Sequence, residues 1–387
     1  MITAASVFWG SFIFLLYIYF LYPLFLLAVA HLLRSRAVKP MLPEEAVLPS
    51  VSVLVIARNE AGHIGAKVEN LLALDYPADL MELVIASDGS TDETDSEVAG
   101  HGRRHVTCIK FRSPRGKPAV LNDVVPNLRG EIVVLMDARQ RVGADVIRQL
   151  VAHFNDPEVG AVSGELIIET PKDGDSLTVQ GMGAYWHLEK IIRKKEAVID
   201  SSIGVTGALY AIRRGLYQPI PEDTLLDDVL IPMNVVRQGF RVLFAPQAQA
   251  FDPANRLAGN EYRRKVRTIA GNFQLFRDHP WLLNPFSNRL WLQTISHKFA
   301  RLLGPPALLA IVVSNLLMLG HPLYQLLLMA QLFFYGAALA GHAGFRWKKA
   351  AWLTSIPFMF CLLNWTTVAG FIRFVRRSQP VTWQQAH

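Results

Sequence analysis

The chain separates its acidic residues from its long apolar runs. All 32 acidic residues lie between Glu44 and Asp278, together with 27 of the 39 basic residues, so this middle segment has a net charge of −5. The two ends carry the other 12 basic residues and no acidic one. Basic residues beside uncharged apolar runs are typical of membrane proteins, whereas nucleic-acid binding needs a basic domain. The pattern predicts an acidic domain held at a membrane, with no nucleic-acid partner.

The N-terminal segment, residues 1–33, is predicted to be a transmembrane anchor. It carries no charge, and about 20 apolar residues are enough to cross a bilayer. It has no basic start and no clear cleavage site, which favours a retained anchor over a removed signal peptide. Arg34, Arg36 and Lys39 follow directly, and such residues mark the cytoplasmic end of a span. We therefore expect an integral protein of a bacterial inner membrane, with the middle domain cytoplasmic.

The C-terminal segment, residues 302–375, is predicted to contain about three transmembrane helices. Residues 302–345 are uncharged and long enough for two crossings, and residues 350–372 are long enough for another. The basic residues within 373–377 would then face outward, against the charge rule, so the side of the C-terminus stays open. Residues 281–301 mix aromatic and basic side chains, which suits an amphipathic helix in the membrane interface.

The middle segment, residues 50–280, alternates short β-branched runs with amphipathic stretches. Apolar runs at residues 51–57, 83–86, 106–111 and 132–136 are expected to be strands, with helices between them. This alternation predicts an α/β domain whose mostly parallel sheet has helices on both faces. Ligands of such sheets bind at the carboxyl ends of the strands, so polar residues at those ends are candidates for a site.

Three carboxylate groups occupy such positions. Asp88 follows the run at 83–86 and either forms an Asp-Gly turn or contacts a nucleotide. Asp137 follows the run at 132–136 and either is a loop acid or binds a metal ion or a sugar hydroxyl. Asp227 and Asp228 precede a helical stretch, where they either stabilise the helix start or form a coupled pair that supplies a general base.

Two basic groups complete the candidates. Residues 115–117 place a glycine between Arg115 and Lys117 at an expected helix start, which suits a diphosphate. Residues 263–267 are the densest basic run, and either belong to a binding site or face anionic lipid headgroups.

The order of these motifs resembles the membrane-bound family 2 glycosyltransferases, inverting enzymes that include cellulose, hyaluronan and poly-N-acetylglucosamine synthases. The resemblance covers nearly the whole chain and implies a GT-A type nucleotide-diphospho-sugar transferase domain with an anchor helix and C-terminal membrane helices. The matching positions are residues 51–60, 87–92, 116–117 with 121–122, Asp137, 206–213 and 227–239.

The resemblance implies a role for each matched position. The implied donor-binding residues are Asp88, Lys117, Asp137, Arg139 and Glu60. The implied acceptor-binding residues are Thr206, Gly207, Arg264 and Arg267. Asp228 takes the place of the general base, with Asp227 as the second catalytic residue. The implied reaction is in-line attack by an acceptor hydroxyl on the anomeric carbon, with inversion and release of a nucleoside diphosphate.

Two positions depart from the family pattern. Arg139 stands where the family has the second acid of its Asp-X-Asp motif, so a Mg²⁺ or Mn²⁺ ion at Asp137 would lose a protein ligand. Either Asp137, water and the diphosphate hold the ion, or Arg139 supplies the positive charge itself. Thr268 replaces the Trp on which processive synthases stack the acceptor sugar, which argues against processive synthesis.

The predicted function is transfer of a hexose from a nucleotide sugar, UDP-linked by preference, to a lipid-linked or glycan acceptor at the cytoplasmic membrane face. Its partners are the donor, the acceptor and membrane lipids. One alternative is a processive polysaccharide synthase that couples polymerisation to export, although few crossings are available to line a polar channel. The other is a non-catalytic nucleotide-binding membrane protein.

Overall fold

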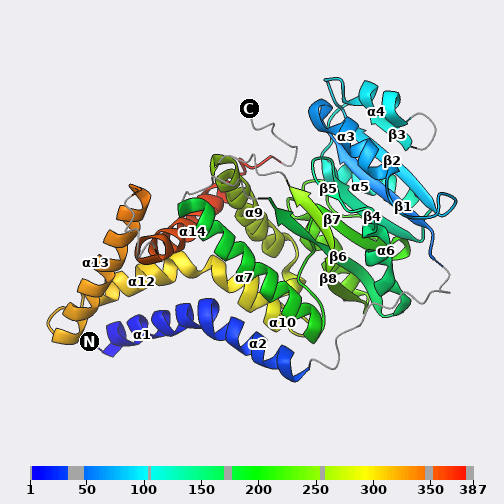
Figure 1. Ribbon diagram of the computed structural model, residues 1–387. Coiled ribbons are helices and arrows are strands. Elements are labelled where there is room, and N and C mark those ends of the chain that lie inside the picture. The colour runs from blue at the N-terminus through cyan, green and yellow to red at the C-terminus, as the bar shows by residue number, and fades with distance from the viewer. Residues whose placement is uncertain are drawn as a thin grey trace.

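The computed structural model describes residues 2–33, 48–102, 106–169, 177–252, 258–344 and 352–380. Figure 1 shows two joined parts, a sheet covered by helices and a group of long helices built from both ends of the chain. The basic residues within 34–39 and 346–349, on which the predicted orientation depends, lie outside the described residues.

The strands form a single mixed sheet in the order β3-β2-β1-β4-β7-β6-β8-β5. The first four strands of that order pair in parallel, whereas β7 runs antiparallel to both β4 and β6. The expected α/β architecture is therefore confirmed, with antiparallel strands that the apolar pattern did not indicate. The strand bounds are β1 Val51–Ala57, β2 Met81–Asp88, β3 Val106–Phe111, β4 Ile132–Asp137, β5 Arg141–Val142, β6 Val159–Ile168, β7 Leu209–Arg213 and β8 Arg241–Asp252.

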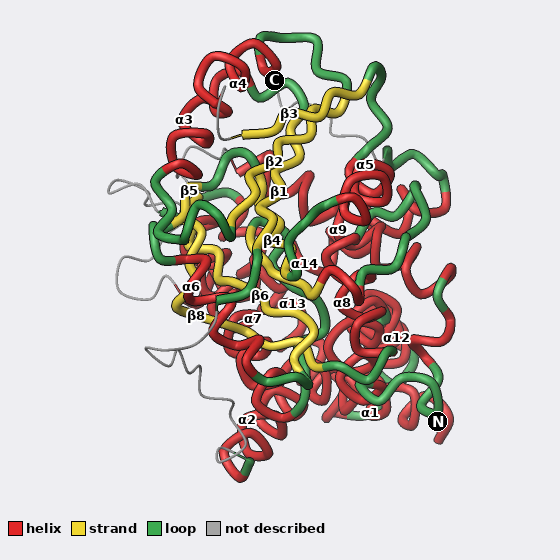
Figure 2. Tube along the Cα trace, turned by 90° about the vertical axis from the view of Figure 1, so that its right-hand side faces the viewer, coloured by secondary structure: helices red, strands yellow, loops and turns green. Residues whose placement is uncertain are grey.

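Helices cover both faces of the sheet (Figure 2) because successive side chains of a strand point to opposite faces. In β1, Val53 and Val55 belong to the core beneath α3 and α6, whereas Leu54 and Ile56 belong to the core beneath α5 and α8. Burying each such side chain contributes about 1.5–3 kcal/mol. The helix bounds are α3 Ala61–Leu72, α4 Thr94–Gly102, α5 Lys117–Val124, α6 Val146–Val151 and α8 Asp227–Arg237, with 3-10 turns at Val125–Asn127, Ala152–Asn155 and Arg214–Leu216.

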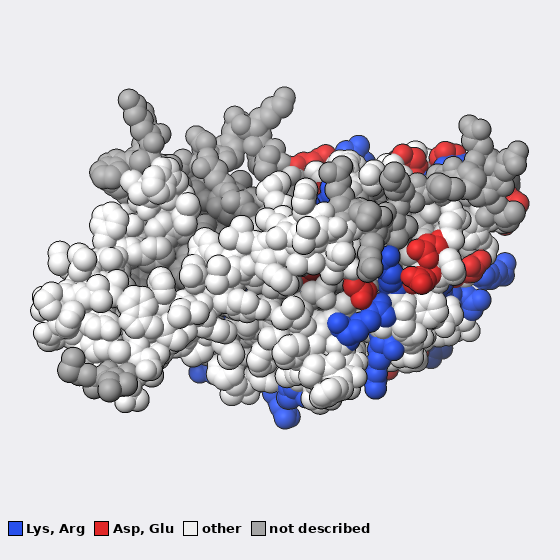
Figure 3. All heavy atoms as spheres, turned by 90° about the horizontal axis from the view of Figure 1, so that it is seen from below, with Lys and Arg blue, Asp and Glu red and all other residues white. Residues whose placement is uncertain are grey.

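The long helices are apolar and expose apolar side chains. A continuous helical segment, Thr3–Leu32, combines α1 Ile2–Leu16, a π-helical turn at Tyr17–Leu21 and α2 Tyr22–Leu32. Three described helices are long and apolar enough to cross a membrane: this segment, α13 Pro322–His342 and α14 Trp352–Val375. Phe333 and Leu339 of α13 are each 70% exposed, which suits contact with lipid. Figure 3 shows few charged side chains on this half of the visible face, whereas they gather over the sheet.

A bent pair of helical segments provides a fourth candidate span. Trp291–Leu302 meets α12 Gly304–Leu316 at 57°. The predicted interfacial segment, residues 281–301, is observed as a 3-10 turn at Pro280–Leu283, a short loop and most of Trp291–Leu302, so its place in a membrane interface stays a prediction. The shorter elements of Trp291–Leu302 are α10 Trp291–Gln293, a π-helical turn at Thr294–Phe299 and α11 Ala300–Leu302.

Two helices join the sheet to the apolar helices. They are α7 Leu177–Ile199 and α9 Ala258–Asp278 (Figure 1). Helix α2 packs on α7 through Tyr22, Leu26 and Ile192. Helix α14 packs on α9 at Gly370, where an added Cβ would lie 2.5 Å from Cγ2 of Ile269. The sheet is therefore fixed against the long helices by direct helix packing.

Candidate active site

A cavity of about 750 Å³ lies between the carboxyl ends of the central strands and helices α7, α8, α9 and Trp291–Leu302. It brings together every site residue predicted from the sequence except Asp88. Those residues are Glu60, Lys117, Asp137, Arg139, Thr206, Gly207, Asp227, Asp228, Arg264 and Arg267.

Asp88 lies beneath the site and not in its wall. Its carboxylate is fully buried at the end of β2, where Oδ1 accepts a hydrogen bond from the Arg115 N–H at 2.7 Å and Oδ2 from the Gly116 N–H at 2.9 Å. Gly116 has φ 92°, which favours glycine, and it precedes α5. Asp88 therefore fixes the loop that carries Lys117, and its direct contact with a nucleotide stays a prediction.

Lys117 places a positive charge between the end of β4 and the start of α8. Its Nζ lies 3.4 Å from Oδ1 of Asp137, at the end of β4, and 3.4 Å from Oδ2 of Asp227, at the start of α8. Burial alone would lower the pKa of Lys117, but the charges of Asp227, Asp137 and Asp228 raise it above its ordinary value. The ammonium group therefore stays protonated at neutral pH.

Asp228 lies partly buried in the first turn of α8 and faces the cavity beside Gly207, where an added Cβ would lie 3.5 Å from Oδ2 of Asp228. Burial and the neighbouring Asp227 raise the pKa of Asp228, and the cations Lys117, Lys298 and Arg193 limit that rise. A carboxylate becomes a stronger base as its pKa rises towards the working pH. Asp228 thus places a carboxylate with a raised pKa in the cavity wall.

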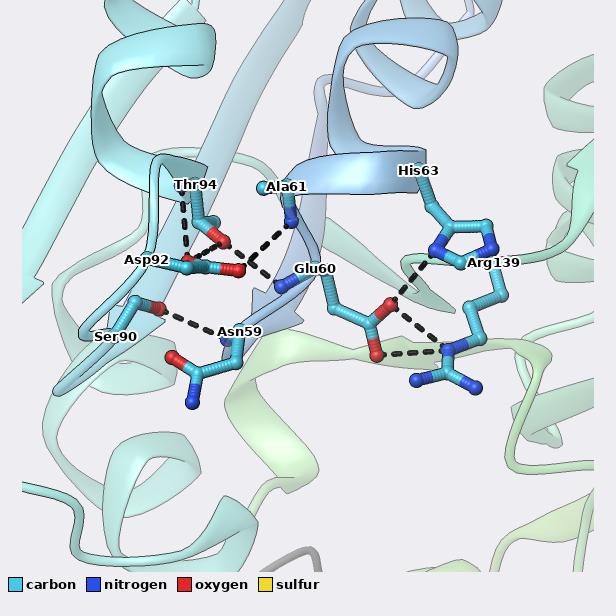
Figure 4. Close-up of polar contacts among 8 residues, drawn as sticks. All are labelled: Asn59, Glu60, Ala61, His63, Ser90, Asp92, Thr94 and Arg139. Atoms are coloured by element: carbon cyan, nitrogen blue, oxygen red, sulfur yellow. Dashed lines mark hydrogen bonds and ion pairs between the residues drawn. The ribbon is translucent and has the colours of Figure 1, made fainter. Parts of the chain in front are cut away.

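Arg139 reaches the cavity from the loop after β4. Its Nε lies 2.8 Å from each carboxylate oxygen of Glu60, and Nδ1 of His63 lies 3.3 Å from the same carboxylate (Figure 4). Within the described part of the chain, neither terminal nitrogen of Arg139 has a hydrogen-bond or ion-pair partner. The ion pair therefore fixes the guanidinium group and leaves its outer edge available to a ligand.

Residues 90–94 hold the backbone around Glu60 in place. The Glu60 N–H donates to Oγ1 of Thr94 at 2.8 Å, and the Ala61 N–H donates to Oδ2 of Asp92 at 3.1 Å (Figure 4). Asn59 has φ 52°, a left-handed conformation that Asn tolerates better than most residues. The motif at residues 87–92 therefore positions two neighbouring loops in addition to forming a turn.

The side of the cavity nearest the long helices carries residues that the sequence argument did not select. Nη1 of Arg193, on α7, donates to Oγ1 of Thr206 at 3.3 Å. Lys298 and Arg301 also line this side, together with Thr367 of α14. The basic run at residues 190–195 is the sequence signal that could have indicated these α7 residues. Because the run is far from the other motifs in sequence, it did not show that α7 lies at the cavity.

A buried polar network supports this side. Nδ1 of His297 lies 2.8 Å from Oε1 of Glu196, and Nε2 of His297 lies 2.9 Å from Oε2 of Glu189. The Tyr22 hydroxyl donates to Oε1 of Glu196 at 3.1 Å, and Arg301 pairs with Glu189. The network ties α2 and Trp291–Leu302 to α7, and so fixes the N-terminal helical segment against the cavity wall.

The residues around Asp137 do not by themselves form a site for a divalent ion. Among the described residues, no group of three or more His, Cys, Asp or Glu side chains is placed to hold a metal. Oδ1 of Asp137 faces the Lys117 ammonium group, and Arg139 is a second cation in the wall of the same cavity. A divalent ion would share its carboxylate with Lys117 and be repelled by both cations.

The mixed sheet and the cavity at its carboxyl edge define a GT-A glycosyltransferase-like domain. Residues 49–272 match the family described as Glycosyltransferase like family 2, and the chain belongs to that family. The solved mannosyltransferase PcManGT from Pyrobaculum calidifontis, in complex with GDP-Man and Mn²⁺, has the same fold, with a TM-score of 0.66, 23% identity and 97% of each chain covered.

Relatives with assigned products are longer than this chain. The β-monoglucosyldiacylglycerol synthase of Nostoc sp. is 27% identical over 241 residues, which cover 60% of this chain and 51% of the relative. The poly-β-1,6-N-acetyl-D-glucosamine synthase of Staphylococcus aureus is 23% identical over 239 residues, which cover 60% and 57%. The chain therefore spans about half the length of the curated relatives it matches.

Proposed function

We propose that the protein is an inverting glycosyltransferase that moves a hexose from a nucleotide sugar, UDP-linked by preference, to an acceptor hydroxyl at the cytoplasmic membrane face. The observation that carries this proposal is one cavity that contains the carboxylate of Asp228 together with the cations Lys117 and Arg139. Displacement of a nucleoside diphosphate needs both a base for the acceptor and positive charge for the leaving group.

In the proposed mechanism the acceptor oxygen attacks the anomeric carbon from the face opposite the diphosphate. The bond between that carbon and the diphosphate oxygen breaks, its electron pair stays on the diphosphate, and Asp228 accepts the hydroxyl proton. Lys117 and Arg139 stabilise the charge that develops on the leaving group. Asp227 keeps Asp228 basic and fixes Lys117 through their 3.4 Å ion pair. No step is assigned to a metal ion.

The acceptor is proposed to be lipid-linked or a glycan that reaches the membrane surface. Thr206, Gly207, Arg264 and Arg267 keep their proposed roles on the acceptor side of the cavity. Thr367 of the apolar helix α14 lines the same cavity, so an acceptor bound there lies next to the membrane helices. A diacylglycerol glycolipid synthase among the relatives supports the lipid-linked form, whereas the poly-N-acetyl-D-glucosamine synthase keeps the processive alternative open.

The function is tested with the purified full chain in lipid nanodiscs and a panel of UDP-, GDP- and dTDP-hexoses. We expect one donor to release its nucleoside diphosphate when membrane lipid extract is present as acceptor, and mass spectrometry to detect a product with one added sugar. Long polymer from the same assay would replace single transfer by processive synthesis. Nucleotide binding without release for any donor would instead support a non-catalytic protein.

A further inference from the structure

The cavity carries more positive than negative side chains. Ten of its lining residues are Lys or Arg and six are Asp or Glu. A nucleoside diphosphate brings at least two negative charges, which this excess can compensate without an added ion. The question is therefore whether cationic side chains of the cavity, and not a divalent metal ion, supply the positive charge that the diphosphate needs.

Arg139 is prepared to bind an oxyanion. Its Nε is bound by both oxygens of Glu60 at 2.8 Å, so the planar guanidinium group is already oriented before a ligand arrives. Its side chain is 43% exposed, and its two terminal nitrogens have no partner among the residues that the structure describes. A guanidinium edge with two N–H groups matches two phosphate oxygens, and a fixed side chain loses little entropy on binding.

Glu60 is itself fixed. The hydrogen bonds from its own N–H to Thr94 and from the Ala61 N–H to Asp92 hold its backbone against the loop after β2 (Figure 4). Its side chain is only 15% exposed, and His63 contacts the same carboxylate. Glu60 lines the cavity and holds Arg139 through both carboxylate oxygens, so its contact with Arg139 gives it a positioning role.

Lys117 provides a second fixed cation. It lies at the N-terminal end of α5, where the helix dipole adds partial positive charge, and its Nζ sits 3.4 Å from Asp137. An ion bound to Asp137 would share its carboxylate with this ammonium group and be repelled by it, whereas a diphosphate would be attracted by it. Lys117 thus favours an anion over a divalent metal next to Asp137, and Arg139 adds positive charge to the wall of the same cavity.

We propose that Arg139, positioned by Glu60, and Lys117 hold the donor diphosphate in place of a divalent ion, so that donor binding and transfer need no metal. The proposal rests on the glycosyltransferase function proposed above. Of the two possibilities that the sequence left open, an ion held at Asp137 or positive charge supplied by Arg139, the proposal chooses Arg139. It makes Arg139 the residue that determines metal dependence.

Nucleotide binding tests the proposal without relying on activity. Calorimetry on the full chain in nanodiscs would measure the affinity for UDP and GDP, first in excess EDTA and then with MnCl₂. We expect the better nucleotide to bind with affinities that agree within about twofold in the two conditions. Donor turnover in excess EDTA should likewise stay within about twofold of its value with MnCl₂.

Variants at Arg139 separate the two mechanisms. Arg139→Ala should weaken nucleotide binding about 10- to 100-fold in both conditions, because it removes a charge-assisted contact. Arg139→Asp restores a second acid two residues after Asp137, and its nucleotide binding should become dependent on MnCl₂. Arg141→Ala is the matched control, since Arg141 is 69% exposed, pairs with Glu169 and lies outside the cavity wall. Glu60→Gln should weaken binding less than Arg139→Ala, because Arg139 remains present but less fixed.

The outcomes distinguish this proposal from the proposed function. Wild-type binding that falls more than about tenfold in EDTA would overturn the metal-free proposal while leaving a metal-dependent glycosyltransferase in place. Arg139→Ala binding equal to that of wild type, in protein with an unchanged thermal unfolding midpoint, would also overturn it. Absence of nucleotide binding in every condition would overturn both proposals.

Discussion

Several motif acids bind the protein's own backbone. Asp88 accepts two backbone hydrogen bonds from the loop before α5, and Asp92 accepts one from the start of α3. A buried carboxylate that receives N–H groups fixes a loop because losing either partner would leave an unsatisfied charge. The sequence placed these acids correctly at strand ends, but it could not show which neighbouring loop would approach them.

The sequence predicted the carboxylates and cations at the strand ends of the cavity wall for a specific reason. Asp137, Arg139 and Lys117 follow strand ends, and the ends of parallel strands meet at one edge of a sheet. Arg193 and Lys298 were missed because they reach the cavity from helices whose packing on the sheet is set by tertiary contacts. No local pattern in a sequence reports such contacts.

The pair of acids at the start of α8 predicts a pH effect. Burial raises the pKa of Asp228 first, and the charge of Asp227 raises it further. A general base works only when deprotonated, so turnover is lost as the pH falls through the pKa of Asp228. Asp227→Asn removes the negative charge that raises the pKa of Asp228, so the acidic limb of the kcat–pH profile should move to lower pH.

The profile would be recorded by nucleoside diphosphate release across the acidic range. Asp223→Asn is the matched control, because Asp223 is exposed and lies outside the cavity wall. Its acidic limb should coincide with that of wild type. A limb that stays in place or moves to higher pH in Asp227→Asn would show that Asp227 does not control the pKa of the base.

At the scale of elements, the sequence predicted where the long apolar helices lie better than how each of them could cross a membrane. Helix α13 lies within the expected run at residues 302–345, and α14 begins in the run at residues 350–372 and ends at Val375, beyond that run. Helix α12 has 13 residues and rises about 20 Å, which is shorter than a bilayer core of about 30 Å. A second crossing in residues 302–345 therefore depends on the bend at Gly304, where Trp291–Leu302 joins α12. Pro305 and Pro306 at the start of α12 are a local cause of that bend, because proline cannot continue the preceding helix.

The positions of several strands could be predicted from the sequence, whereas the pairing of strands that lie far apart in the chain could not. Strands β1, β3 and β4 agree with the expected apolar runs to within one residue. Strand β6 pairs in parallel with β8 although α7, β7 and α8 lie between them in the chain. Pairing between segments so distant in sequence is determined by packing around α7 and α8.

The contact between α14 and α9 predicts an effect on both stability and activity. Gly370→Ala places a Cβ 2.5 Å from Cγ2 of Ile269 and 3.1 Å from the Ala270 nitrogen, so α14 must move away from α9. We expect a loss of about 1–3 kcal/mol in stability. Because α9 carries Arg264 and Arg267, turnover should fall as well.

The matched control for this contact lies on α13. Gly336→Ala places its Cβ in open space, with no atom within 4 Å, and alanine favours a helix over glycine by about 1 kcal/mol. Its thermal unfolding midpoint, followed by tryptophan fluorescence in detergent, should equal or exceed that of wild type. Equal destabilisation by both substitutions would contradict a specific contact at Gly370.

At the scale of the whole molecule, the apolar helices and the charged sheet domain occupy opposite ends (Figures 1 and 3). We propose that the sheet domain faces the cytoplasm. In a chain with Cys108→Ser and Cys361→Ser, Arg129→Cys would introduce a thiol at a position where the Arg129 side chain is 90% exposed. A membrane-impermeant maleimide should label it in inverted vesicles and not in intact cells; labelling in intact cells would reverse the orientation.

The most direct test of glycosyl transfer in this cavity is the Asp228→Asn substitution, assayed for nucleoside diphosphate release with the preferred donor. Loss of a general base should lower turnover by about 10²- to 10⁴-fold, while nucleotide affinity stays within about twofold of wild type. Asp223→Asn should keep wild-type turnover. Unchanged release by Asp228→Asn would contradict the assignment of Asp228 as the base.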